Sequence, residues 1–218
     1  MNLDVLLITN YKAKQLNEFK LLLARTMKLS KTDDWSMHVR TVKDKHWLTI
    51  RSGNKKARLL LLALPLMFSD KTEFYNDLNF KAEKYLFTEE WIYGLKDKPG
   101  LEQVIGSTNQ EFFGRDVHPT VVDKATHLWY SIATKQLFHN GNKRTALLSG
   151  ITLLNLNFID LPNVGAKELY NISLKLAEKE MSEVQLKQYI LAHAVLSTKF
   201  MNLYLDQFSY VNESRGND

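Results

Sequence analysis

The segment from Lys135 to Ala146 reads Lys-Gln-Leu-Phe-His-Asn-Gly-Asn-Lys-Arg-Thr-Ala, a polar loop that leads into an apolar segment. The apolar pattern continues through Leu147, Ile151 and Leu154 at helical spacing. A helix that is apolar almost all round is typical of the centre of an all-α core. This stretch therefore predicts a helical domain built around the helix that begins near Asn142.

The same stretch places a glycine, an asparagine and two cations at the mouth of that helix. The first N–H groups of a helix lack intrahelical acceptors, and the helix dipole favours negative charge there by about 0.3–1 kcal/mol. Gly141 lets the backbone approach a phosphate closely, and Lys143 and Arg144 supply counter-charge. The pattern predicts a phosphate site over Gly141, Asn142, Lys143 and Arg144. The alternative is a plain loop-to-helix junction, capped by Asn142, with both cations in solvent.

Two other helices of this domain carry local signals. Pro119 stands at an opening position of a helix that extends to Lys135, where its missing N–H costs nothing. Ser182 and Gln185 have the spacing of a capping box and open a last core helix.

The first third of the chain has a different pattern. Apolar residues at helical spacing predict a helix over about 10–28, and β-branched and aromatic residues predict a hairpin over 35–50. A second apolar helix is expected to begin near Lys56. We therefore predict a small α+β extension over residues 1–80 and a mainly α domain over residues 81–218.

The composition excludes several classes of protein. The 218 residues include no cysteine, which excludes a disulfide framework, a thiolate zinc site, an iron–sulfur cluster and a cysteine nucleophile, and fits the reducing cytoplasm. The longest apolar run, Leu59 to Phe68, contains Pro65 and is much shorter than the ~20 residues that span a bilayer. We expect a cytoplasmic protein without membrane contact.

Positive charge is concentrated near the amino terminus. Residues 1–64 hold 13 Lys or Arg against 5 Asp or Glu, a net charge of +8 within an overall +5. A basic patch near Trp35 and Trp47 predicts an approach to the phosphate backbone of nucleic acid or to an acidic partner. The simpler alternative is a solvated face of lysines around a small core.

The helix-mouth stretch resembles the signature of the Fic/Doc family, in particular of its Doc-like, death-on-curing branch. That branch reads His-x-Phe-x-Asp-Ala/Gly-Asn-Lys-Arg-Thr-Ala, and Phe138 and the run from Gly141 to Ala146 match it position for position. Pro99 to Glu102 and Phe113 to Thr120 are similar to the segment that the family places over its active site. Leu169 to Ile190 is similar to its two closing helices.

The resemblance implies a Fic/Doc-like helical bundle with a short flap, in which Phe113, Gly114 and His118 are flap candidates. It implies a toxin-type transferase that moves a phosphoryl or AMP group (AMPylation) from ATP or another nucleoside triphosphate, with Mg²⁺, to a protein hydroxyl. Asn142 then contacts phosphate, and Lys143 and Arg144 hold the other phosphates. The implied partners are a protein target, with translation elongation factor Tu as the family precedent, and a small antitoxin.

Two positions depart from the family motif. Gln136 stands where the family has the histidine that acts as general base, and an amide does not accept a proton near neutral pH. Asn140 stands where the family has the acidic magnesium ligand, so that it is at most a weak Mg²⁺ ligand. His139, in the variable slot before Asn140, is a weaker candidate for the base.

These departures leave two hypotheses open. The first is an active but impaired transferase, in which Gln136 and Asn140 occupy the catalytic positions. The second is a catalytically inactive module that binds nucleotide or protein, with nucleic acid bound through the amino-terminal part. No pair of histidines has the helical i, i+4 spacing of a metal site with a third ligand nearby, so we predict no structural metal.

Overall fold

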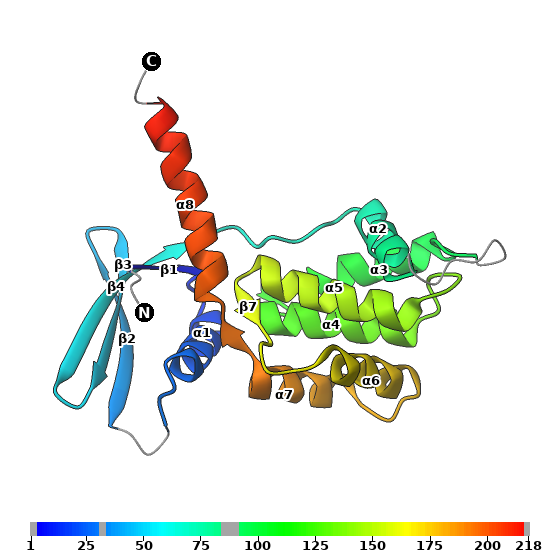
Figure 1. The fold of residues 1–218 in the computed structure, drawn as a ribbon, viewed down its shortest axis with the longest axis horizontal. Coiled ribbons are helices and arrows are strands. Elements are labelled where there is room, and N and C mark those ends of the chain that lie inside the picture. The colour runs from blue at the N-terminus through cyan, green and yellow to red at the C-terminus, as the bar shows by residue number, and fades with distance from the viewer. Residues whose placement is uncertain (1–3, 31–33, 84–91, 216–218) are drawn as a thin grey trace. The chain divides into compact units, whose positions relative to one another are not determined.

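A computed structural model describes residues 4–30, 34–83 and 92–215 of the chain. It divides into two compact units, shown in Figure 1. The first unit comprises residues 1–66, 157–160 and 195–218, and the second comprises residues 67–156 and 161–194. The boundary that the sequence suggests near residue 80 stays a prediction.

The first unit is built on a four-stranded mixed sheet. Its strands are β1 (Val5–Ile8), β2 (Trp35–Val42), β3 (Lys45–Ser52) and β4 (Lys55–Ala63), in the order β1-β4-β3-β2. β1 runs parallel to β4, and the other neighbours are antiparallel. The unit also contains α1 (Ala13–Thr26), β7 (Ile159–Asp160), β8 (Val195–Leu196) and α8 (Thr198–Arg215).

The hairpin and the first helix agree with the sequence. Lys43 and Asp44, which join β2 to β3, have φ angles of 49° and 61°. Two positive φ angles are what a two-residue hairpin turn of the primed type requires. The prediction of a helix near Lys56 was wrong, because residues 55–63 form strand β4. The leucines that follow Arg58 gain hydrogen-bonded neighbours on both sides, from β1 and β3, which a lone helix there would not have.

In the residues that the structure describes, the second unit consists of helices and one short hairpin. Its elements are α2 (Thr72–Glu83), α3 (Lys98–Thr108), β5 (Glu111–Phe112), β6 (Arg115–Asp116), α4 (Val121–Thr134), α5 (Asn142–Leu156), α6 (Ala166–Ala177) and α7 (Glu183–His193). The predicted mainly α class with a short flap-like hairpin and an amino-terminal α+β part is confirmed. In the described part of the chain, no helix is both long and apolar enough to cross a bilayer.

Helices α4 and α5 lie side by side at the centre of the second unit (Figure 1). Trp129 of α4 is fully buried, and its indole N–H donates to Ser173 Oγ of α6 at 2.7 Å. A Cβ at Gly150 of α5 would lie 2.9 Å from Trp129 Cβ, so the absence of a side chain there permits the close approach. α5 is therefore the central helix that its sequence predicts.

Side-chain caps fix where two of these helices begin. Thr120 Oγ1 accepts the Asp123 N–H at the start of α4. Ser182 and Gln185 form the predicted capping box at the start of α7, with each side chain bonded to the other residue's backbone N–H. Such caps typically contribute ~1 kcal/mol each, so these starts are set by local sequence.

Replacing Gly150 by alanine is expected to destabilise the protein. The added methyl group meets Trp129 below normal contact distance, and overpacking costs ~1–3 kcal/mol, more than the ~0.5–1 kcal/mol that alanine gains in a helix. Gly106 in α3 is the matched control, because nothing lies within 4 Å of its added Cβ, and Gly106→Ala should be neutral or stabilising. Urea unfolding compares the two, and equal midpoints would contradict the packing described.

Candidate functional site

The loop before α5 is held by backbone pairing with the segment before α3. Leu137 O accepts the N–H groups of Lys96 and Asp97 at 2.8 and 3.0 Å, and the His139 N–H donates to Gly94 O at 3.0 Å. These bonds fix the loop's path over the residues that the family motif covers. The backbone of the loop is therefore held by hydrogen bonds at the positions from which its polar side chains project.

Asn142 braces the same loop with its side chain. Its Oδ1 accepts the Phe138 N–H at 2.9 Å, and its Nδ2 donates to Phe138 O at 2.8 Å and to Gln136 Oε1 at 3.2 Å. Phe138 itself is buried. Because the Asn142 side chain is committed to the loop, its backbone N–H is the group it offers to an anion.

Asn79 of α2 joins three segments around this loop. Its side chain is fully buried, and Nδ2 donates to Asn140 O at 2.8 Å and to Thr145 Oγ1 at 2.9 Å. Its Oδ1 accepts the Gly94 N–H at 2.9 Å. Thr145 is fully buried, whereas Gly94 and Asn140 are half-buried. Leaving a buried polar group such as the Asn79 amide without partners would cost ~1–3 kcal/mol.

The cation Arg144 is paired with a carboxylate from α2. Arg144 Nε donates to Glu83 Oε1 at 2.8 Å, and Nη2 donates to Glu83 Oε2 at 2.9 Å. The Glu83 side chain has no exposed surface, whereas that of Arg144 is 33% exposed. This two-pronged arrangement is the strong form of an arginine–carboxylate pair.

Glu83 also lies against the mouth of α5. Gly141 has a φ of +75°, and a Cβ there would stand 2.2 Å from Glu83 Oε1. Gly141 O accepts the Thr145 N–H, so the helix opens directly after this glycine. Glycine is required here both by the backbone conformation and by the carboxylate. The predicted anion cradle thus has a negative group of the protein beside it.

A polar pocket of about 210 Å³ opens at this helix mouth. Its lining combines the predicted catalytic and phosphate-binding residues with two others: Gln136, His139, Asn140, Gly141, Asn142, Lys143, Arg144 and Tyr170. Ligand sites for whole small molecules are usually ~300–1,000 Å³. The pocket therefore suits phosphate groups, while the remainder of a nucleotide would extend beyond it.

A larger pocket of about 630 Å³ adjoins the first at His139, which lines both. It is formed largely by α2 and the segment before α3, including Asn76, Asp77 and Tyr93. His139 is the lining residue that the two pockets have in common.

The flap candidates lie elsewhere on the second unit. Phe113 and Gly114 form the turn between β5 and β6, and Phe113 is 91% exposed. His118 follows the hairpin and stacks on His127, with ring centroids 4.1 Å apart. Among the described residues that line the two pockets, none of these three occurs.

The chemistry of the small pocket is that of hydrogen-bond donors and positive charge. Lys143, the N–H groups at the start of α5 and the Gln136 amide can each donate to a phosphate oxygen. Asn140 Nδ2 donates to Ile92 O, which leaves its Oδ1 as a neutral oxygen ligand. Of the described residues that line the pocket, none is Asp or Glu, so a magnesium ion would depend on phosphate oxygens for charge.

Sequence reasoning missed Glu83, Asn79 and Tyr170. Glu83 is 61 residues from Arg144 along the chain, so no local spacing connects them. For Asn79, the available signal was a polar side chain among the buried positions of an amphipathic helix, together with Tyr75 and Leu78. Such a residue indicates a buried hydrogen-bond hub, although the sequence does not name its partners.

Arg144→Ala is expected to lower the free energy of unfolding by ~3–5 kcal/mol, because it removes this cation from a buried carboxylate. Lys143→Ala, one residue away and partly exposed, should change the free energy of unfolding by ~0.5 kcal/mol or less. Chemical denaturation measures both. If the double variant Glu83→Gln/Arg144→Ala is more stable than Arg144→Ala, the buried ion pair is supported. Equal losses of stability in Arg144→Ala and Lys143→Ala would contradict it.

Part of the second unit is similar to a known protein family. Residues 77–154 match the model of the Fic/DOC family. The match begins in α2 and runs through α5, so it includes Asn79, Glu83 and the whole loop of the small pocket. No curated protein was found that is similar to the chain.

Proposed function

We propose that the Fic/DOC family domain formed by residues 77–154 binds the phosphates of a nucleoside triphosphate at the mouth of α5 and transfers a phosphoryl or AMP group to a protein hydroxyl only slowly. Its binding groups are the N–H groups after Gly141 together with Lys143. The slow transfer follows from the absence of a base at Gln136. The protein is in this view a nucleotide-binding module with impaired Doc-like transferase activity.

The observation that carries this proposal is the hydrogen bond between Gln136 and Asn142. The Gln136 Oε1 accepts from Asn142 Nδ2, so the amide group that remains is an NH₂ donor at the wall of the small pocket. A donor can orient a hydroxyl or a phosphate oxygen but cannot remove a proton. Loss of a positioned base typically slows such a reaction by ~10²–10⁴-fold.

The pair between Glu83 and Arg144 limits phosphate binding in the same proposal. Glu83 occupies the Nε and one Nη2 donor of Arg144 and offsets its charge, and the same carboxylate opposes an anion at Gly141. Lys143 carries no such partner in the described residues, so it is the cation available for the first contact. We expect weak nucleotide affinity in the unmodified protein.

The partners and the Doc-like branch rest on resemblance alone. The motif from Gly141 to Ala146 supports a cytoplasmic protein target, with elongation factor Tu as the precedent, and a small antitoxin. Support for Mg²⁺ comes from the remaining oxygen of Asn140. Labelled ATP and a cytosolic extract test the transferred group and the protein target.

Gln136→His combined with Asn140→Asp is expected to increase transfer by ~10²–10⁴-fold, because the pair restores a base and a charged magnesium ligand. Purified protein is incubated with a cytosolic extract and ATP labelled at the α or γ phosphate, in separate reactions. Label from α-labelled ATP indicates nucleotidyl transfer, and label only from γ-labelled ATP indicates phosphoryl transfer.

Lys143→Ala is the binding control for this assay. Calorimetry with ATP and Mg²⁺ should show weaker binding in Lys143→Ala, and the Gln136→His variant should bind ATP about as well as the unmodified protein. Efficient transfer by the unmodified protein, with no gain in the double variant, would contradict the proposal of a lost base. Absence of ATP binding at millimolar concentration would contradict the phosphate site.

A second candidate function is nucleic-acid binding by the first unit, favoured by one face of its sheet. The registers of β2, β3 and β4 place the following side chains on that face: His38, Arg40, Trp47, Thr49, Arg51, Lys56 and Arg58. A depression of about 210 Å³ lies among five of them. The opposite face carries buried Met37, Leu48 and Leu61, so the basic face is the one turned to solvent.

The charges on this face are available to a ligand. In the described part of the chain, no carboxylate pairs with Arg40, Arg51, Lys56 or Arg58, and the Arg58 guanidinium lies 4.3 Å from the Trp47 ring centroid. Unpaired cations beside an aromatic ring favour a phosphate backbone. The candidate nucleic-acid surface is therefore one face of the sheet rather than the whole basic region of residues 1–64.

Arg51→Ala and Lys56→Ala should each weaken oligonucleotide binding and reduce the dependence of log K on log salt by about 1. The physical reason is the loss of one phosphate contact and its released counterion. Lys14→Ala on α1 removes the same charge from an exposed site off this face and should leave binding nearly unchanged. Fluorescence anisotropy with labelled single-stranded RNA and duplex DNA, over 50–200 mM salt, measures all three, and equal losses would contradict a localised face.

A further inference from the structure

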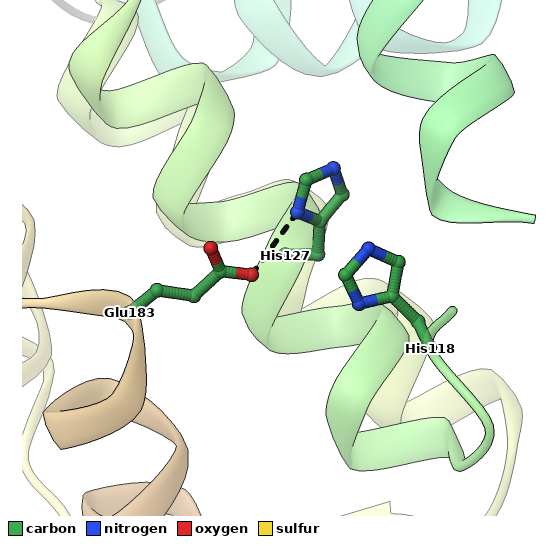
Figure 2. Close-up of side chains that lie close together, drawn as sticks. All are labelled: His118, His127 and Glu183. Atoms are coloured by element: carbon green, nitrogen blue, oxygen red, sulfur yellow. Dashed lines mark hydrogen bonds and ion pairs between the residues drawn. The ribbon is translucent and has the colours of Figure 1, made fainter. Parts of the chain in front are cut away.

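Three potential metal ligands meet in the second unit, away from the small pocket. His118 precedes α4, His127 lies within α4, and Glu183 is the first residue of α7. One ligand atom from each of the three lies within 4.8 Å of the other two. Figure 2 shows the Glu183 carboxylate directed at the His127 ring, with the His118 ring beside it.

The tightest pair already has the spacing of two ligands on one ion. His127 Nδ1 and Glu183 Oε1 are 3.0 Å apart. Ligands that bind Zn²⁺ at 2.0–2.1 Å in tetrahedral geometry stand about 3.3 Å from each other. His118 stacks on His127 with an angle of 22° between the rings, so it must turn its ring to share an ion with the other two. That adjustment concerns one half-buried side chain that precedes a helix.

A neighbour fixes the orientation of the His127 ring. Its Nε2 lies 2.8 Å from Ser107 Oγ, and the Ser107 hydroxyl donates to Val104 O at 3.0 Å. With one tautomer of His127, Ser107 Oγ accepts from the Nε2–H, and the Nδ1 lone pair faces the Glu183 carboxylate, where a metal ion can lie between the two atoms. With the other tautomer, Ser107 donates to Nε2 instead and the Nδ1–H donates to Glu183 Oε1.

The Ser107 contact is also the kind that accompanies metal-binding histidines, whose second ring nitrogen usually donates to a nearby oxygen. Other charged groups around the cluster are the ion pair of Asp123 and Lys187, and Lys124, which donates to Thr108 O. Burial and the neighbouring His127 lower the pKa of His118.

We propose that His118, His127 and Glu183 form a binding site for one divalent transition-metal ion of the Zn²⁺ class. Two imidazoles and a carboxylate suit Zn²⁺ better than Mg²⁺, which prefers oxygen ligands. The three ligands leave a fourth position for water. The prediction of no structural metal used only the spacing of histidines along a helix. These three ligands come from separate segments, so that criterion does not detect them. The site ties the end of the β5–β6 hairpin to α4 and α7.

The test is a Zn²⁺ titration of protein that has been treated with a chelator and dialysed. Calorimetry should show one Zn²⁺ per chain, with affinity lowered at least tenfold in His118→Ala and in Glu183→Gln. Ser107→Ala, which removes the orienting contact, should lower affinity ~10–100-fold. Co²⁺ should give the visible absorption of a four-coordinate site, and His118→Ala should abolish it. Zn²⁺ should also raise the Tm of the unmodified protein.

His193→Ala is the matched control, because His193 lies outside the cluster and bonds to Tyr189 O. It should bind Zn²⁺ as the unmodified protein does. Circular dichroism confirms that each variant is folded, and the partly exposed His118 makes its variant the one on which the test depends. No Zn²⁺ binding at 100 µM, or binding equally retained in His118→Ala and Glu183→Gln, overturns the proposal and assigns the contact between His127 and Glu183 as a hydrogen bond.

Discussion

A buried carboxylate needs a cation, and in this protein that requirement connects α2 to α5. Glu83 is fully buried and is held by Arg144 in a two-pronged pair. Removing a charge from water costs several kcal/mol, which the pair recovers only while its geometry is kept. The end of α2, the glycine at the helix mouth and the position of Arg144 are therefore set together. The pair thus fixes the wall of the small pocket at Gly141 and Arg144.

The same constraint sets the charges around the small pocket. Lys143, Arg144 and the N–H groups at the start of α5 make its wall positive, whereas Glu83 places a negative charge beside Gly141. Asn142 and Asn79 hold the loop with their side chains. An anion at this helix mouth would be attracted by the cations and the N–H groups and repelled by the Glu83 carboxylate.

Features carried by adjacent residues were predictable from the sequence. The capping box of Ser182 and Gln185 and the β2–β3 hairpin depend on chemistry within a few residues, and both are present. The small pocket brings together Gln136 and the run from Asn140 to Arg144 for the same reason: they are contiguous on one loop and helix turn. Local signals suffice where the partner is nearby in the chain.

Features that depend on distant partners were not predictable. The leucines after Arg58 suit a helix or a buried strand equally, and only their pairing with β1 and β3 decides between them. The pair of Glu83 with Arg144 and the contact of His127 with Glu183 likewise join residues that are 61 and 56 positions apart. The spacing of such residues along the sequence does not indicate that they lie close together in the fold.

The division of the chain also bears on how the protein emerges from the ribosome. The second unit is contained within residues 67–194, whereas the first combines the amino-terminal sheet with residues 157–160 and 195 onward. Strand β8 pairs with β7, and the Leu196 N–H donates to Thr26 of α1. The first unit therefore includes residues that are translated after the whole of the second unit. Domains generally fold as their residues appear. The four strands of the amino-terminal sheet are therefore translated before the helical unit, and the contact of α1 with β8 forms only after it.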